Sequence, residues 1–356
     1  MKNNTKPALR HGGVIIALVL CVCTVLTLSL GGVGRAKAID LNQNCTLTVS
    51  PGTVTGVEDA NVVIDLYKVA DAKELGNQDS MSFQATSPYS SLSDEITSTT
   101  SQTSNADYQS LAQSLAAITL TSGQSIAKAA DGIPAGETIS ELQSGLYLVI
   151  AHGEGLTNYV QTVTDESGTE KLVTVAYSSD SIYSFQPELI SLPTKEADEN
   201  GVVNTANSGA WIYDATAVLK PEQSPRYGTL EIQKTLDTFE TDHPATCVFQ
   251  VEAWTDSAKT TSVYSNVVSI TFDAPGVKTA LVENVIPVGS YVEVTEVYSG
   301  SVYVLDSVQT QTAEIVADEI VSVAFDNTYT PGGNSGGSVN NHFDYAADTG
   351  WGWTKE

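Results

Sequence analysis

Three polar residues stand where a strand pattern of alternating apolar residues would place side chains in a protein core. They are Lys234, Glu296 and Asn327, in the stretches 230–236, 292–298 and 323–329. Successive side chains of a strand point to opposite faces, so all three should share the core face of a β domain. A buried charge without a partner is costly, and we therefore expect the three side chains to lie close together.

A lysine, an asparagine and a carboxyl group in contact could form an amide bond. Burial lowers the pKa of a lysine and raises that of a carboxyl group. A neutral Lys234 amine could attack the side-chain carbonyl of Asn327, while protonated Glu296 donates to that carbonyl and shuttles the proton as ammonia leaves. The product would be an isopeptide bond between the first and last strands. The alternative is a buried Lys234–Glu296 ion pair with Asn327 as a hydrogen-bond partner, and spacing alone does not separate the two.

The N-terminus has the pattern of a secretory signal. Basic residues precede an apolar run over 14–30, and Ala36-Lys37-Ala38 fits the cleavage pattern of small residues. We predict a signal peptide over 1–38, and hence an extracellular protein that is secreted or associated with the cell surface. The apolar run is long for a signal core, so an uncleaved anchor is the alternative.

The rest of the chain is strongly acidic. The net formal charge is −26; without residues 1–38, which hold five basic and no acidic residues, 11 basic and 42 acidic residues give −31. Such a surface repels phosphate backbones and anionic lipid, so we expect no nucleic-acid partner and no membrane contact beyond the signal segment. The sequence shows no convincing catalytic triad, zinc spacing, calcium loop or nucleotide-binding motif. We therefore expect no cofactor, no metal site and no enzyme activity beyond a single isopeptide reaction.

Short strands separated by turn signals predict an all-β protein of tandem immunoglobulin-like sandwiches, the first with a small helical insertion. The expected division is an N-terminal β domain over 39–221 with an insertion over 79–131, a second β domain over 226–330, a Gly/Ser linker over 331–338 and an aromatic tail over 339–356. Within the insertion, we expect a Ser/Thr-rich loop over 79–105 and a helix within 106–131. The stretch 221–225 is expected to be a short, stiff linker.

The second β domain resembles a Cna B-type domain, a module of Gram-positive pilins and adhesins. The resemblance covers roughly residues 227–330 and rests on the stretches 228–234, 245–251, 287–296 and 325–329. In that family, a lysine in the first strand bonds to an asparagine in the last, and a glutamate catalyses the reaction. Lys234, Asn327 and Glu296 match those positions. The resemblance implies a prealbumin-like sandwich and favours the isopeptide bond over the ion pair.

The N-terminal β domain is similar to pilin N-terminal modules, although its first strand has no lysine and no isopeptide bond is expected there. Residues 211–220 are similar to the pilin motif W-x3-V-x-V-Y-P-K. Trp211 and Lys220 keep their spacing, but both valines become alanine and Tyr-Pro becomes Val-Leu. The resemblance implies that Lys220 is a sortase acceptor; the alternative is an exposed lysine that closes a strand.

These features predict a structural subunit of a pilus or cell-surface fibre, with other pilin subunits and a sortase as partners. The alternative is a secreted or cell-associated adhesin that binds a host glycan or matrix protein as its surface ligand. Its candidate surfaces would be the 79–131 insertion and the aromatic tail. The family's usual L-P-x-T-G signal does not occur in the sequence, so wall anchoring is not predicted from it.

Overall fold

The computed structural model describes residues 38–75, 80–99, 105–121, 123, 125–195, 211–239, 245–300, 302–330, 341–346 and 350–355. The predicted signal peptide, apart from Ala38, and the predicted linker 331–338 lie outside these residues. The chain divides into two compact units, unit 1 over 1–178 and 182–223 and unit 2 over 179–181 and 224–356. Within the described ranges, no helix is long and apolar enough to cross a membrane.

Unit 1 combines several sheets with two helices, α1 (Ser93–Ser98) and α2 (Asn105–Thr121). Its main sheet has the order β10 (Glu188–Leu192), β6 (Gly145–Gly153), β2 (Val62–Leu75) and β3 (Ser80–Ala85), with β4 (Ala130–Pro134) also paired to β2. A second sheet has the order β13 (Asp214–Val218), β1 (Cys45–Ser50) and β5 (Thr138–Leu142). A third has the order β14 (Glu222–Pro225), β9 (Ser181–Phe185), β8 (Glu170–Tyr177) and β7 (Val160–Thr164), and β11 (Thr194–Lys195) pairs with β12 (Trp211–Ile212).

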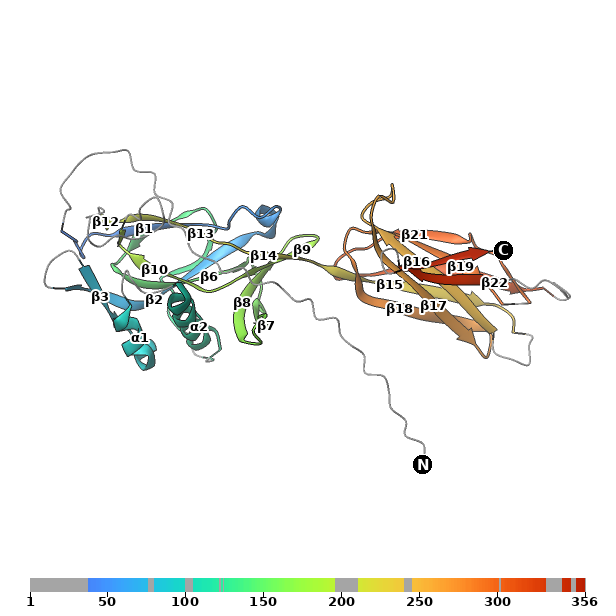
Figure 1. Cartoon of the computed structure of the whole chain (residues 1–356), viewed down its shortest axis with the longest axis horizontal. Helices are drawn as coiled ribbons and strands as arrows, with labels where there is room; N and C mark the ends of the chain where they lie inside the picture. The colour runs from blue at the N-terminus through green and yellow to red at the C-terminus, as the bar shows by residue number, and fades with distance from the viewer. Residues whose placement is uncertain are drawn as a thin grey trace, which may run out of the picture. The chain divides into compact units, whose positions relative to one another are not determined.

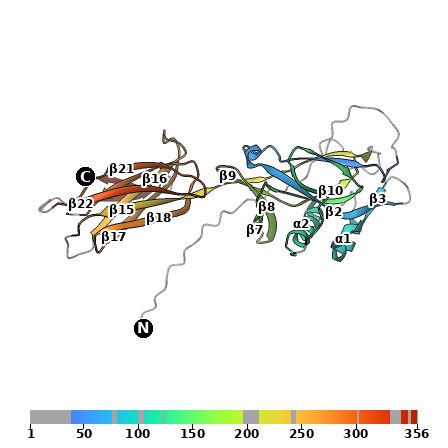
Figure 2. The ribbon, with the colours of Figure 1, turned by 180° about the vertical axis from the view of Figure 1, so that it is seen from behind.

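Strand β6 is the centre of unit 1, and every residue in it is buried. Leu146, Leu148 and Ile150 belong to one core, together with residues of α1 and α2. Tyr147 and Val149 belong to a second core, which they share with the sheet of β13, β1 and β5. Alternation along the strand thus sends neighbouring side chains into two different cores. Both ribbon views show α1 and α2 on the same side of the main sheet (Figures 1 and 2).

The insertion of unit 1 is more ordered than its composition suggests. The prediction of a loop over 79–105 is wrong, since this stretch contains β3, a short 3-10 helix over Tyr89–Leu92 and α1. Each of these elements is anchored by one buried apolar residue, namely Phe83, Tyr89 and Ile96. The predicted helix is confirmed as α2, although it ends at Thr121.

The stretch 221–225 is not a free linker, because β14 occupies most of it as an edge strand beside β9. Proline is tolerated on an edge strand, where its missing N–H faces away from the ladder. Gln186 and Pro187 separate β9 from β10.

Unit 2 is a sandwich of two four-stranded sheets. One has the order β18 (Gly276–Pro287), β15 (Tyr227–Leu236), β22 (Ile320–Tyr329) and β20 (Tyr303–Leu305). The other has the order β17 (Ser262–Phe272), β16 (Ala245–Trp254), β19 (Tyr291–Tyr298) and β21 (Thr310–Glu314). Alternate residues of β15 and β16 are buried between the sheets, as period-two strands require. The predicted all-β class, with β-sandwiches and a small helical insertion in the first part, is confirmed.

Strands distant in the sequence lie side by side in each unit. In unit 2, β15 and β22 are parallel neighbours, in register from Thr229↔Ile320 to Leu236↔Asn327. In unit 1, β1 and β13 are likewise parallel, from Thr46↔Asp214 to Ser50↔Val218. The first strand of unit 2 is therefore bonded directly to a strand almost at its end.

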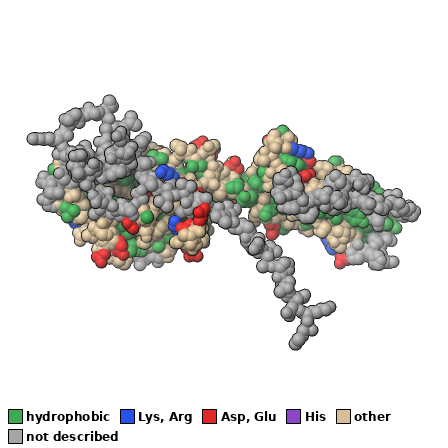
Figure 3. Space-filling model, in the orientation of Figure 1, with side chains coloured by type: hydrophobic (Ala, Val, Ile, Leu, Met, Phe, Trp, Pro, Cys, Tyr) green, Lys and Arg blue, Asp and Glu red, His purple; other side chains and the backbone are tan. Residues whose placement is uncertain are grey.

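The predicted aromatic tail forms an antiparallel hairpin of β23 (Asn341–Ala346) and β24 (Gly350–Lys355). Over the face drawn in Figure 3, Asp and Glu side chains are spread across the described surface, in keeping with the net charge of −26.

Candidate functional site

The structure brings Lys234, Glu296 and Asn327 together in the core of unit 2. Lys234 lies on β15 and Asn327 on the neighbouring strand β22, whereas Glu296 comes from β19 in the facing sheet. Their exposed fractions are 0%, 3% and 1%. All three side chains are thus withdrawn from water between the two sheets.

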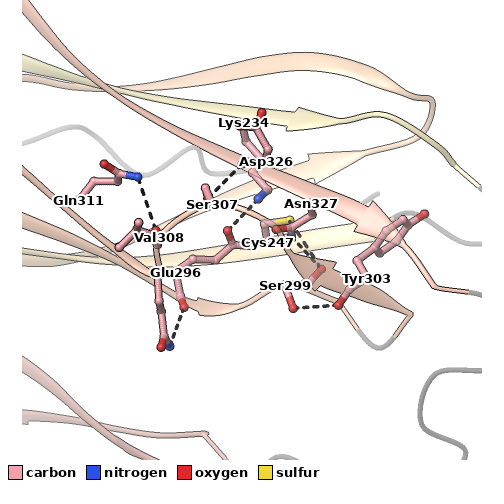
Figure 4. A network of polar contacts seen from close by, with 11 residues as sticks. Lys234, Cys247, Glu296, Ser299, Tyr303, Ser307, Val308, Gln311, Asp326 and Asn327 are labelled. Carbon is pink, nitrogen blue, oxygen red and sulfur yellow. Dashed lines mark hydrogen bonds and ion pairs between the residues drawn. The ribbon is translucent and has the colours of Figure 1, made fainter.

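Glu296 contacts both of the other side chains (Figure 4). Lys234 Nζ donates to Glu296 Oε2 at 2.7 Å, and Asn327 Nδ2 donates to Glu296 Oε1 at 2.7 Å. The amide oxygen of Asn327 is buried and has no hydrogen-bond partner among the described residues. The sequence predicts that Glu296 donates to this oxygen, but in the structure the carboxylate accepts a hydrogen bond from the amide nitrogen.

The surroundings favour a neutral amine at Lys234. Burial lowers the pKa of Lys234 below its ordinary value, although the hydrogen bond and charge of Glu296 oppose this shift. The centroid of the Phe325 ring lies 6.0 Å from Nζ, and this cation–π contact favours the ammonium form, so it opposes the effect of burial as Glu296 does. A neutral amine is the nucleophilic form of lysine.

A fourth residue, Cys247 on β16, completes the cluster. Its side chain is fully buried, and its Sγ lies 3.8 Å from Asn327 Nδ2. Burial, chiefly, raises the pKa of Cys247 to about 12, so the thiol stays protonated at neutral pH. The alternation over 245–254 indicates that Cys247 faces the core, but a strand pattern does not say which residue of the other sheet it meets.

Lys220 is not part of this cluster. It follows β13 in unit 1 and is exposed, directly after buried Leu219. Together with Glu188, which is only 5% exposed, it lines a cavity of about 10 Å³, enough for roughly one water molecule. Ala215 and Ala217 are buried, as alternation along β13 requires.

Unit 1 contains a second buried polar cluster, which the sequence analysis missed. Asp65 on β2 is fully buried; its Oδ2 lies 2.5 Å from Lys128 Nζ and 3.2 Å from His152 Nε2, and its Oδ1 accepts the Gly132 N–H at 2.9 Å. Burial raises the pKa of Asp65, but hydrogen bonds from His152, Lys128 and Gly132 outweigh it and lower the pKa to about 2. The hydrogen bonds of Lys128 to Asp131 and Asp65 outweigh its partial burial and raise its pKa. The pKa of Asp65 is lowered and that of Lys128 is raised, so both charges are stabilised here, whereas burial lowers the pKa of Lys234 in the other cluster.

Comparison with known proteins gives similarity at a low level. No family model matches the chain, and no curated protein sequence matches it.

Within the described residues, no group of three or more His, Cys, Asp or Glu side chains is placed to hold a metal ion.

Among solved structures, the chain is similar to GBS52, the minor pilin of Streptococcus agalactiae, at 12% identity and a TM-score of 0.22, over 83% of this chain and 100% of that one. It is similar to the major pilin SpaD of Corynebacterium diphtheriae at 11% identity and a TM-score of 0.22, over 83% and 100%. It is also similar to a C-terminal fragment of the pilus adhesin SpaC of Lactobacillus rhamnosus GG at 9% identity and a TM-score of 0.21, over 81% and 98%. Similarity at this level does not extend to function, which has to be inferred from the chain's own residues.

Proposed function

We propose that this protein is a structural subunit of a pilus or cell-surface fibre, and that an amide bond between Lys234 and Asn327 stabilises unit 2. The observation that carries this proposal is the buried carboxylate of Glu296, which lies 2.7 Å from both Lys234 Nζ and Asn327 Nδ2. One acid–base group thus contacts the nucleophile and the leaving group at the same time. The secretory pattern of residues 1–38 and the acidic surface support a location outside the cell.

The reaction follows from these contacts. The Lys234 ammonium passes a proton to Glu296 Oε2, and the neutral amine attacks Cγ of Asn327. As the Nζ–Cγ bond forms, protons move through Glu296 to Nδ2, the Cγ–Nδ2 bond breaks and ammonia leaves. One proton remains on Glu296, so that both charges of the buried pair are lost. The step needs no oxidant or cofactor and occurs once per chain, so it is self-modification and not turnover.

The product would be more stable than the ion pair for two reasons. A buried ion pair barely recovers the cost of desolvating its charges, whereas the amide leaves none to desolvate. The new bond would also close a loop of roughly 90 residues, which by the chain-entropy relation used for disulfides is worth about 4–5 kcal/mol.

The intact mass of the purified protein tests this bond. We compare the wild type with Glu296→Gln and with the control Glu293→Gln. Glu293 lies on the same strand as Glu296, and its ion pair with Lys259 has the same N–O distance as the Lys234–Glu296 pair, 2.7 Å. The wild type and the control should be lighter than calculated by one ammonia, and Glu296→Gln should not. A wild type at its calculated mass would refute the bond and favour the ion pair. The protein would then be better explained as an adhesin without the cross-link.

We further propose that Lys220 accepts the acyl group of another subunit in a sortase reaction. Its exposed position after β13, next to buried Leu219, supports this role, since a transferring enzyme could reach the amine. Co-expression with a candidate sortase and a donor protein that carries an L-P-x-T-G signal should yield a covalent adduct of the wild type and of the control Lys171→Arg, but not of Lys220→Arg. An adduct of Lys220→Arg in the same amount would assign the acceptor to another residue.

A further inference from the structure

We propose that Cys247 is a positioning residue, whose thiol acts with the backbone carbonyl of Ser299 to hold the Asn327 amide with its nitrogen toward Glu296. The effect on reaction rate rests on the proposed isopeptide function, whereas the orientation of the amide does not. The four groups come from separate strands and one turn of unit 2 and meet in its core (Figure 4).

Three acceptors surround the amide nitrogen of Asn327. Nδ2 lies 2.7 Å from Glu296 Oε1, 3.4 Å from the carbonyl oxygen of Ser299 and 3.8 Å from Cys247 Sγ. The sulfur itself lies 3.9 Å from the Ser299 oxygen and donates its hydrogen there. The thiol therefore accepts from Nδ2 and donates to Ser299, which uses both of its hydrogen-bonding capacities.

This arrangement selects one of the two orientations of the amide. A half-turn about the side-chain bond would place the amide oxygen against the Ser299 carbonyl and the Glu296 carboxylate, which are both acceptors. No donor attracts the oxygen at its present position, because Oδ1 has no hydrogen-bond partner among the described residues. The contacts of Nδ2 therefore decide the orientation, and Cys247 supplies one of them.

The selected orientation places the departing atom beside the group that protonates it. Glu296 takes a proton from Lys234 and has Nδ2 within 2.7 Å to receive one. An amide turned the other way would present its oxygen to Glu296 and leave the nitrogen without a proton donor. We expect Cys247 to increase the rate of ammonia loss without taking part in any covalent step.

The test uses full-length Cys247→Val and Cys247→Ser, with Cys45→Val as the matched control. Cys45 is also a fully buried thiol, and its Sγ lies 3.9 Å from the Gln43 carbonyl in unit 1. The starting material is unreacted protein recovered unfolded from inclusion bodies. The readout is its rate of ammonia loss on refolding, followed by intact mass, with circular dichroism to confirm the fold. Cys247→Val should react about tenfold more slowly, the loss expected for one hydrogen bond, while Cys247→Ser and Cys45→Val should keep the wild-type rate. Equal rates in all variants, or equal slowing by valine and serine in folded protein, would overturn the proposal.

A second measurement is independent of the bond. In Lys234→Met, which has no amine to react, the Asn327 side-chain NH2 should give two NMR signals with slow solvent exchange. Adding Cys247→Val should speed the exchange, and adding Cys247→Ser should not. If the wild type keeps its ammonia, the isopeptide function fails, but this exchange still decides the orientation. Unchanged exchange in the valine variant would overturn it.

Discussion

Lys234 and Glu296 face each other across the sandwich of unit 2, with Nζ 2.7 Å from Oε2 and both side chains almost wholly buried. Such a pair is a weak source of stability, because desolvation of the two charges nearly offsets their attraction. Glu296 has a second contact, since the same carboxylate also accepts a hydrogen bond from Asn327 Nδ2. Under the proposed function, the pair serves a reaction between Lys234 and Asn327 and is not kept for its strength as an ion pair.

Removal of the pair should distinguish a cross-link from a simple ion pair. Lys234→Met alone should lower the free energy of unfolding of unit 2, since it removes the amine that forms the bond and leaves the buried Glu296 carboxyl group without its partner. In the double variant Lys234→Met/Glu296→Leu no charge is stranded, yet the protein should stay about 4–5 kcal/mol less stable than the wild type, because the closed loop is lost. Urea unfolding of the three proteins measures this. A double variant as stable as the wild type would mean that no cross-link contributes.

Unit 1 should be acid-sensitive through Asp65. Its pKa is lowered from an ordinary 3.8 to about 2, so its contribution to stability is complete above pH 4 and disappears as the pH falls from about 4 to 2. The shift corresponds to about 2 kcal/mol. Asp65→Asn should flatten the stability of unit 1 over this interval in urea titrations at fixed pH. Asp131→Asn is the control, because Asp131 also binds Lys128, at 2.6 Å, but is largely exposed. A steep acid transition that persists in Asp65→Asn would contradict the assignment.

Gly228 should not tolerate a methyl group. A Cβ there would lie 2.5 Å from Ile315 Cγ2 and 2.8 Å from the Val316 carbonyl oxygen. Gly228→Ala should destabilise unit 2 by about 1–3 kcal/mol, the usual cost of overpacking. Gly352→Ala is the comparison, since nothing lies within 4 Å of its added Cβ. Thermal unfolding measures both, and equal melting temperatures would refute this close contact.

Helix α2 should contribute to the stability of the core of unit 1. Leu115 of α2 is fully buried in the same core as Leu146, Leu148 and Ile150 of β6. Leu115→Ala should cost about 2–5 kcal/mol, as large-to-small core changes do. Ser114→Ala, one position away on the exposed side, should change the stability little. Chemical unfolding monitored in the main sheet distinguishes the two results, and an unchanged sheet in Leu115→Ala would show that the helix is dispensable.

The site in unit 2 could be predicted because its strands have one buried face. There, an inward polar residue such as Lys234 interrupts a clear alternation, and three interruptions in one domain suggest a cluster. The central strands of unit 1 lack this contrast. β6 is buried on both faces, and β2 nearly so over its first half, so Asp65 has no exposed neighbours to mark it as unusual.

Other features depend on contacts that no local pattern contains. The approach of Cys247 to Asn327 joins two facing sheets, and alternation predicts a face but not a partner across the core. The elements β3 and α1 were missed because each is held by a single apolar side chain, Phe83 or Ile96, among Ser and Thr residues. Such anchors are too sparse to give a period, and the surrounding core decides the structure.

The parallel pairing of β15 and β22 determines how unit 2 responds to tension. The chain enters β15 at Tyr227 and leaves β22 at Tyr329, and in a parallel pair these two points lie at opposite ends of the ribbon. Force applied to them slides one strand along the other, so the hydrogen bonds of the ladder resist together and do not open one by one. β1 and β13 share this arrangement in unit 1. In each unit, the parallel pairing alone means that tension loads the hydrogen bonds between the two strands in shear. This resistance is present before any covalent bond is added.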